Sequence, residues 1–193
     1  MRLKIVPHRR RREGKTNYRK RLDLLKSRKV RFVVRKSSKN IYCQLVEYQK
    51  AGDKTLLSSN SQELRKFGWN AECGNLPAAY LTGLLCGLKA KEKKISDVVL
   101  DTGLYRSVNG SRIYAALKGA LDSGLDVKHS EEVFPSQERI SGKHIAEYAA
   151  KIKKEKPTQY KKQFSGYLEQ KVNPEELTKL FESTKAKILS EGK

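Results

Sequence analysis

The sequence predicts an α/β fold in which a mixed sheet, made of an antiparallel meander and a parallel crossover strand, carries packed helices. Three observations predict it. Segments of strand periodicity, separated by turn-forming residues, fill positions 30–59; helical periodicity replaces them after residue 75; and a short apolar run at 98–100 interrupts the helical part. Hydrophobic residues make up 37% of the 193 positions, which is enough for one core.

The antiparallel meander is expected in the first third of the chain. Its strands are predicted at 30–36, 41–48 and 55–59, with turns at 37–40 and 51–54. In the first strand, apolar side chains alternate with Arg31 and Arg35. Because neighbouring strand residues point to opposite faces, Val30, Phe32 and Val34 should share one face of this strand and the two arginines the other.

The first long helix is expected from Asn75, as the capping residue, to Lys94, with Pro77 in its first turn. The run is apolar on most sides, so the helix should be buried. Gly83 and Gly87, four positions apart, predict a close approach of this helix to the sheet.

The remaining core elements follow at regular intervals. The apolar run 98–100 ends at Asp101 and predicts a central strand that is covered on both faces. A second helix over 112–123, with Gly124 as its C-cap, and a short strand over 125–127 complete the order β-β-β-α-β-α-β. A mixed sheet with helices packed on it accommodates this order.

The polar segment after Pro135 has helical periodicity. Ser141 is the expected cap of a helix that runs to Ile152, and Asn173-Pro174 begins the last helix. The buried seam of that last helix should contain Leu177, Leu180, Phe181, Thr184 and Ile188. Between these helices, the segment 156–171 is interpreted as a connector that a partner orders. The chain therefore divides into a basic arm over 1–28, a core domain over 29–134 and a helical C-terminal extension over 135–193.

The distribution of charge predicts a polyanionic partner. The net charge is +21, and residues 1–36 contain sixteen Lys and Arg against Glu13 and Asp23, whereas residues 37–142 contain fourteen against twelve acidic residues. A solvated surface normally mixes both signs, so the arm is expected to bind phosphates and to release counterions from them. A membrane partner is not expected, because no stretch approaches the roughly 20 apolar residues of a spanning helix and no signal-peptide pattern opens the chain.

Catalytic and metal-binding signals are weak. Cys43, Cys73 and Cys86 lack C-x-x-C spacing and are interpreted as buried free thiols of a reducing compartment. The sequence lacks the common hydrolase, zinc-protease, phosphate-loop and dinucleotide motifs. The acidic residues that could hold a catalytic metal are Glu47, Asp97, Asp101 and Asp122. Asp101 is better explained as a turn residue that binds its own loop backbone. No enzyme activity, cofactor, metal or small-molecule substrate is therefore expected.

Three single residues allow two interpretations each. Tyr18 could stack on an unpaired base or pack against the domain, and neither is favoured. Trp69 could stack on a base, but anchoring its loop to the core is the favoured role. His144 could contact RNA, whereas capping a helix at the surface is slightly favoured.

Several motifs together resemble the L-eighteen family of large-subunit ribosomal proteins. They are the hairpin Arg31–Ser37 with Asn40–Leu45, the segments Leu100–Arg106 and Ala115–Ala120, and two stretches similar to the archaeal and eukaryotic branch, His129–Pro135 and Glu138–Ile145. The chain length is similar to that of the archaeal form. The resemblance implies a three-layer fold similar to ribonuclease H. It also implies binding to 5S rRNA, contact with large-subunit rRNA and neighbouring ribosomal proteins, and a place in the central protuberance of the cytoplasmic ribosome.

The expected RNA contacts combine the charge argument with the resemblance. The arm should contribute Arg9, Arg10, Arg11, Arg12, Lys15, Tyr18, Arg19, Arg21 and Arg28. The resemblance adds residues of the first strand and its turn, of the third strand and of the loop after residue 102: Arg35, Lys36, Ser37, Asn40, Thr55, Ser58, Ser59, Tyr105 and Arg106. Charge alone leaves DNA open, but no helix-turn-helix, zinc-finger or basic-zipper pattern is present, and the family motifs favour RNA.

Overall fold

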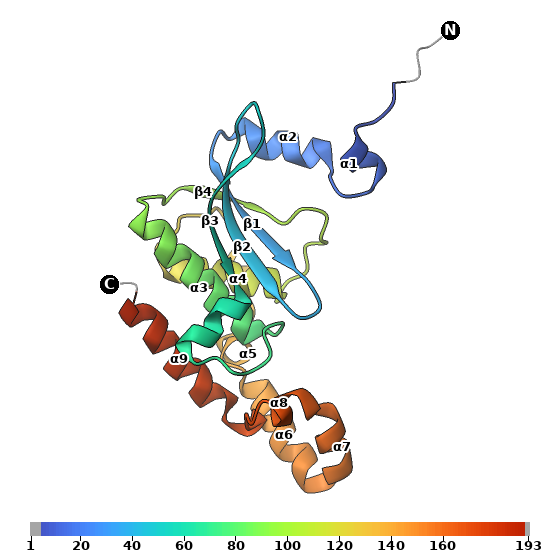
Figure 1. The fold of residues 1–193 in the computed structure, drawn as a ribbon, viewed down its shortest axis with the longest axis vertical. Helices are drawn as coiled ribbons and strands as arrows, with labels where there is room; N and C mark the ends of the chain where they lie inside the picture. The colour runs from blue at the N-terminus through green and yellow to red at the C-terminus, as the bar shows by residue number, and fades with distance from the viewer. Residues whose placement is uncertain (1–4, 192–193) are drawn as a thin grey trace.

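A computed structural model describes residues 5–191 of the chain (Figure 1). Residues 1–4 of the predicted arm and residues 192–193 of the predicted extension lie outside the described residues. The sheet contains β1 (Val30–Lys36), β2 (Ile41–Glu47), β3 (Lys54–Asn60) and β4 (Val98–Asp101), in the spatial order β3-β2-β1-β4. β2 pairs antiparallel with both β1 and β3, and β4 pairs parallel with β1. The predicted mixed sheet is confirmed.

The strand predicted over 125–127 is reduced to a single parallel bridge between Asp97 and Asp126. The Asp126 carbonyl accepts the Val98 N–H, and the Asp126 N–H donates to the Ser96 carbonyl. These two bonds hold the segment beside β4, but they do not extend into a fifth strand within the described residues.

Helices α3 (Leu76–Glu92) and α4 (Arg112–Asp122) cover one face of the sheet (Figure 1). Asn75 caps α3 as expected, since its side chain accepts the Ala78 N–H. The prediction for Gly83 was wrong about the partner: it faces α4 rather than the sheet, and a Cβ there would lie 1.9 Å from the Ala116 carbonyl oxygen. The two helices therefore pack at backbone distance.

Trp69 and the three cysteines belong to the core. Trp69 follows the 3₁₀ helix η1 (Ser61–Phe67), is fully buried and donates from Nε1 to the Glu72 carbonyl at 3.3 Å. Its predicted anchoring role is confirmed. Cys43, Cys73 and Cys86 are buried free thiols, also as predicted, and burial raises the pKa of the Cys86 thiol to about 12.

The described part of the C-terminal extension is helical. After η2 (Glu131–Val133), which ends just before it, the extension contains α5 (Gln137–Ile140), α6 (Lys143–Glu155), α7 (Pro157–Gln163), α8 (Ser165–Glu169), η3 (Pro174–Glu176) and α9 (Leu177–Glu191). The predicted seam packs α9 against α3 and η1, with Leu177, Phe181, Thr184 and Ile188 buried.

Two expectations for the extension need correction. Ser141 does not cap α6; Gly142, with a φ of +81°, precedes its first residue, Lys143. The segment 156–171 was expected to be a connector that a partner orders, but the chain itself folds it as α7 and α8 and buries its three aromatic side chains.

The arm lies on the opposite face of the sheet from α3 and α4. It contains α1 (Arg9–Arg12) and α2 (Tyr18–Lys26). The structure places these helices across a hollow above the sheet rather than as a second packed helical layer. Val33 and Val46 are buried on this side, separate from the main core.

Candidate nucleic-acid interface

A hollow of about 1100 Å³ separates the arm from the open face of the sheet. Both of its sides carry cationic and hydrogen-bonding side chains. The arm supplies Arg10, Lys15, Thr16, Asn17, Tyr18, Lys20 and Arg21; the sheet and the loop after β4 supply Arg31, Arg35, Gln44, Thr55, Thr102 and Tyr105. Three carboxylates, those of Asp23, Asp53 and Asp101, lie among them.

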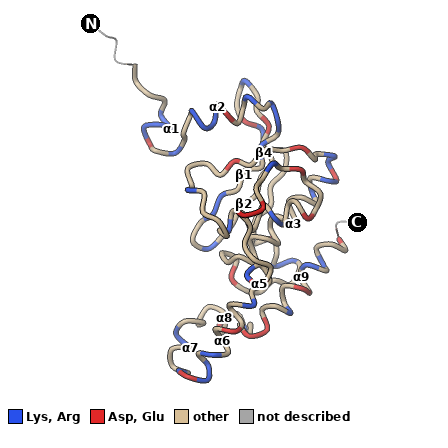
Figure 2. The backbone as a smooth tube through the Cα atoms, turned by 180° about the vertical axis from the view of Figure 1, so that it is seen from behind, with Lys and Arg blue, Asp and Glu red and all other residues tan. Residues whose placement is uncertain are grey.

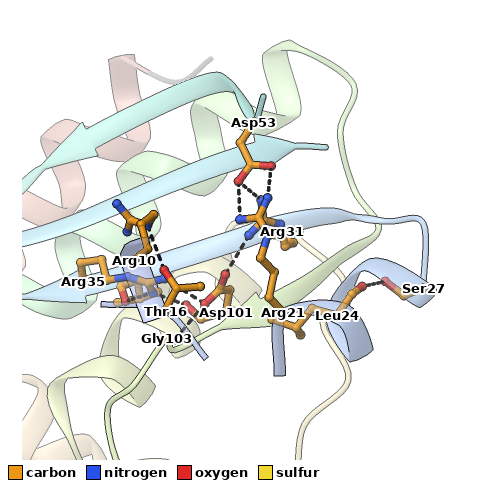
Figure 3. Close-up of polar contacts among 11 residues, drawn as sticks. Arg10, Thr16, Arg21, Leu24, Ser27, Arg31, Arg35, Asp53, Asp101 and Gly103 are labelled. Atoms are coloured by element: carbon orange, nitrogen blue, oxygen red, sulfur yellow. Dashed lines mark hydrogen bonds and ion pairs between the residues drawn. The ribbon is translucent and has the colours of Figure 1, made fainter. Parts of the chain in front are cut away.

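Alternating charges join the arm, the β2–β3 turn and the end of β4 (Figure 3). Arg21 donates to both carboxylate oxygens of Asp53, from Nη1 at 2.7 Å and from Nη2 at 2.8 Å. Arg31 Nη2 lies 2.6 Å from Asp53 Oδ2, and Arg31 Nη1 lies 3.1 Å from Asp101 Oδ2. Arg35 Nη2 completes the series at 2.9 Å from Asp101 Oδ1. We call these five residues the ion ladder.

The ion ladder keeps both carboxylates ionised. Burial raises the pKa of Asp53, but the hydrogen bonds from Arg21 and the close guanidinium of Arg31 outweigh it, so the pKa lies below its ordinary value. Burial likewise opposes ionisation of Asp101, while the charge and hydrogen bond of Arg35, followed by the Gly103 N–H, lower its pKa overall. The five members together contribute one net positive charge.

Asp101 also has the turn role that the sequence predicted. The Gly103 N–H donates to Asp101 Oδ1 at 2.8 Å, and Arg35 Nη1 donates to the Asp101 carbonyl at 2.7 Å. Its pairing with two arginines was not predicted. Arg31 and Asp101 are almost fully buried, with side chains 5% and 8% exposed, so the ladder connects this loop to the interior of the sheet.

The exposed cations of the arm differ from those of the ion ladder. Arg9–Arg12 form α1, which buries none of its residues. Glu13 lies 3.6 Å from Arg9 and 2.9 Å from Lys15, and Arg10 Nε donates to the Thr16 hydroxyl. Within residues 5–28, five exposed arginines have no carboxylate within 4 Å: Arg10, Arg11, Arg12, Arg19 and Arg28. Tyr18 is half-buried, and its ring centroid lies 4.9 Å from that of His8.

The β1–β2 turn is held in a defined shape. The Asn40 N–H donates to the Ser37 hydroxyl at 2.9 Å, and the Ser37 N–H donates to the Asn40 carbonyl at 2.8 Å. Arg112 Nη1 donates to the carbonyls of Ser37 and Gly74, at 3.2 and 2.6 Å. Arg112 thus fixes the turn to the segment that precedes α3, a role that sequence reasoning missed.

The loop after β4 lies beside this turn. The Tyr105 hydroxyl donates to the Lys36 carbonyl at 2.5 Å, and Lys36 Nζ lies 5.4 Å from the centre of the Tyr105 ring. Arg106 is exposed between two exposed apolar side chains, Leu104 and Val108. The structure therefore brings together two predicted contact segments that are far apart in the sequence.

The predicted RNA-contacting residues of β3 do not all lie on the same face of the sheet. Thr55 and Ser58 are exposed, and Ser58 pairs with Gln44 on the open face. Ser59 is fully buried opposite Cys43, because neighbouring strand residues point to opposite faces. The Ser59 hydroxyl is therefore out of reach of RNA, in contrast to the expectation.

Three of the acidic residues considered as metal ligands, Asp97, Asp101 and Asp122, are engaged with cationic groups. Asp97 lies 2.5 Å from Lys29 Nζ, and Asp122 accepts the Tyr80 hydroxyl at 2.7 Å and lies 3.3 Å from Lys118 Nζ. Across residues 5–191, no three His, Cys, Asp or Glu side chains converge as a metal site. In the same part of the chain, no helix has the length and apolar character needed to cross a membrane.

These features define a nucleic-acid-binding protein. Exposed arginines surround a polar sheet face, and rigid turns present hydroxyl, amide and aromatic groups beside it. The family model described as "Ribosomal large subunit proteins 60S L5, and 50S L18" matches residues 2–98 and 88–130. The chain belongs to this family: it is an RNA-binding protein of the large ribosomal subunit and takes part in translation.

Proposed function

We propose that this protein binds 5S rRNA and anchors it to the large-subunit rRNA in the central protuberance of the cytoplasmic ribosome, next to neighbouring ribosomal proteins and without catalysis. The observation that carries the proposal is that some arginines are exposed and others are paired with carboxylates. Those of α1 are exposed, whereas Arg31 and Arg35 are held by the ion ladder on the sheet. Arginines that are free to contact phosphates and arginines that hold the sheet and its loops thus belong to different segments.

The exposed arginines would supply most of the binding free energy. Each phosphate that they contact releases a counterion, and the planar guanidinium can also stack on a base. The ordered groups would select the RNA by its shape. Ser37, Asn40, Thr55 and Ser58 offer hydroxyl and amide groups for 2′-hydroxyls and phosphates, and Tyr105 with Arg106 offers stacking surfaces.

The experiment measures the affinity for 5S rRNA as a function of salt concentration. The test variant replaces Arg9, Arg10, Arg11 and Arg12 with Gln; the matched control replaces four exposed lysines away from the interface, Lys91, Lys94, Lys128 and Lys179. If all four arginines contact phosphates, the slope of log affinity against log salt should decrease in magnitude by about three in the test variant. A smaller change is expected in the control.

The specific partner is tested with a second RNA. The wild-type chain should prefer 5S rRNA to an unrelated structured RNA of equal length at every salt concentration. Equal affinity for both RNAs would refute the 5S assignment. An unchanged salt slope in the arginine variant would refute the role of the arm.

A further inference from the structure

A second cationic surface lies on the C-terminal extension. Residues 151–162 contain six lysines and one acidic residue, Glu155. Lys153 pairs with Glu175 at 2.9 Å. The other five are exposed and, within residues 5–191, have no carboxylate within 4 Å: Lys151, Lys154, Lys156, Lys161 and Lys162. We call these five residues the lysine surface.

Aromatic packing holds the lysine surface in place. Tyr160 and Phe164 are buried, with their ring centres 5.3 Å apart. The ring centres of Phe164 and Tyr167 are 5.9 Å apart. The Tyr167 hydroxyl accepts a hydrogen bond from Asn75 Nδ2 at 3.2 Å. Because Asn75 caps α3, the helical hairpin that carries the lysines is tied to the core. The like charges are therefore brought together by the fold rather than by a flexible tail.

The lysine surface is far from the arm. α6 and α7 lie at one end of the longest axis of the molecule, and α1 and α2 lie toward the other (Figure 1). Basic residues are present at both ends in the rear view (Figure 2). The sheet and α3 lie between them. A ligand that fills the hollow under the arm therefore leaves the lysine surface exposed.

We propose that the lysine surface binds the phosphate backbone of a second RNA, the large-subunit rRNA, while the arm and the open sheet face bind 5S rRNA. This inference rests on the proposed function and assigns the second of its two RNA contacts. The packed helices hold five unneutralised lysines along residues 151–162; their ammonium groups repel one another, and a polyphosphate relieves that repulsion. Lysine binds as a point charge, without the planar fork of arginine, so this contact positions the RNA without reading its sequence.

A protein partner fits this surface less well. The cores of protein–protein interfaces are depleted of lysine, because burying an ammonium group requires its desolvation. Tyr160, Phe164 and Tyr167, which a protein partner could use as anchors, are already buried in this chain, and Tyr148 on α6 is the one aromatic side chain of α6–α8 that is exposed. The exposed groups beside it include the five ammonium groups of the lysine surface.

The test uses the full chain and replaces all five lysines of the lysine surface with Gln. The matched control replaces five exposed lysines elsewhere: Lys66, Lys91, Lys94, Lys128 and Lys179. Two quantities are measured for each protein: the affinity for labelled 5S rRNA, and the capture of the protein–5S complex on immobilised, protein-free large-subunit rRNA. Relative to the control, the test variant should keep its 5S affinity within about threefold and lose at least about tenfold in capture. Circular dichroism establishes that both variants are folded.

The outcomes separate this inference from the proposed function. If the wild-type chain binds large-subunit rRNA but does not select 5S rRNA, the proposed function is refuted. If, in that case, the test variant alone loses its binding to large-subunit rRNA, the role of the lysine surface is still supported. Capture equal to that of the control would overturn the inference. A parallel loss of 5S affinity would also overturn it, because the lysines would then belong to the first site. If capture equals that of the control and the test variant also fails to assemble in a separate reconstitution of the subunit, the inference is overturned and the lysines are assigned to an acidic protein.

Discussion

Replacing Asp101 with Asn tests the ion ladder most directly. Asn has the same shape and can still accept the Gly103 N–H, so neither a cavity nor a broken turn is expected. The change removes the charge that faces two arginines. Arg31 is the more sensitive of them, because its side chain is 5% exposed and would retain only Asp53 as a counterion.

The size of the stability loss in Asp101→Asn follows from the burial of its ion pair with Arg31. Removing one partner of a buried ion pair typically costs about 3–5 kcal/mol, because a charge remains uncompensated away from water. Asp53 still contacts Arg31 and is itself 27% exposed, so we expect the lower end, about 3 kcal/mol. For a chain of this size, that corresponds to a decrease in Tm of about 6–12 °C. The exposed pair of Lys29 with Asp97, whose carboxylate is 54% exposed, provides a contrast: Asp97→Asn should cost less than about 1 kcal/mol.

Urea unfolding followed by circular dichroism measures these free energies. A double variant, Arg31→Met with Asp101→Asn, removes both charges and should be more stable than the sum of the single losses predicts. If Asp101→Asn and Asp97→Asn have equal effects below 1 kcal/mol, or if the double variant shows simple additivity, the ladder does not behave as a buried network and the reasoning is wrong.

Three further predictions concern pH, positioning and packing. Folding lowers the pKa values of Asp53 and Asp101, so the stability that these carboxylates contribute should be complete above the ordinary carboxyl pKa and should be lost as the pH falls through their folded-state pKa values. Acid unfolding of the wild type and of Asp101→Asn, followed by circular dichroism, should differ between these pH values and converge below them. Arg112→Met should weaken 5S binding by loosening the β1–β2 turn, yet leave the salt slope unchanged, since its guanidinium binds carbonyls; a reduced slope would make it a phosphate contact instead. Gly83→Ala, which would stabilise an isolated helix by about 1 kcal/mol, should destabilise the protein by about 1–3 kcal/mol in urea unfolding because the Ala116 carbonyl occupies the space; a stabilised variant would contradict the packing.

Local patterns in the sequence were sufficient for the main elements. Alternation of apolar and polar residues predicted β1, β2 and β3, and the capping residue Asn75 with Pro77 predicted the start of α3. The surplus of arginine and lysine before residue 37 predicted a polyanionic partner, and the matched family is ribosomal. Each of these features depends on neighbouring residues or on total charge, so no knowledge of distant contacts is needed.

Other features depended on the tertiary structure. The sequence could not distinguish arginines available to phosphates from arginines engaged with carboxylates, because the partners of Arg21 and Arg31 lie 32 and 70 positions away. The same limit applied to the segment 156–171: its aromatic residues gave no local indication that the chain itself would bury them.

Composition, periodicity and capping thus determined the strands, the helices and the class of ligand, because these are set within a few residues along the chain or by its total charge. The tertiary structure alone decided which cations stay exposed and which form the ion ladder, and it placed five lysines on packed helices away from the arm. The physical reason is that ion pairing and burial depend on distances through space, which folding sets between residues far apart in the sequence.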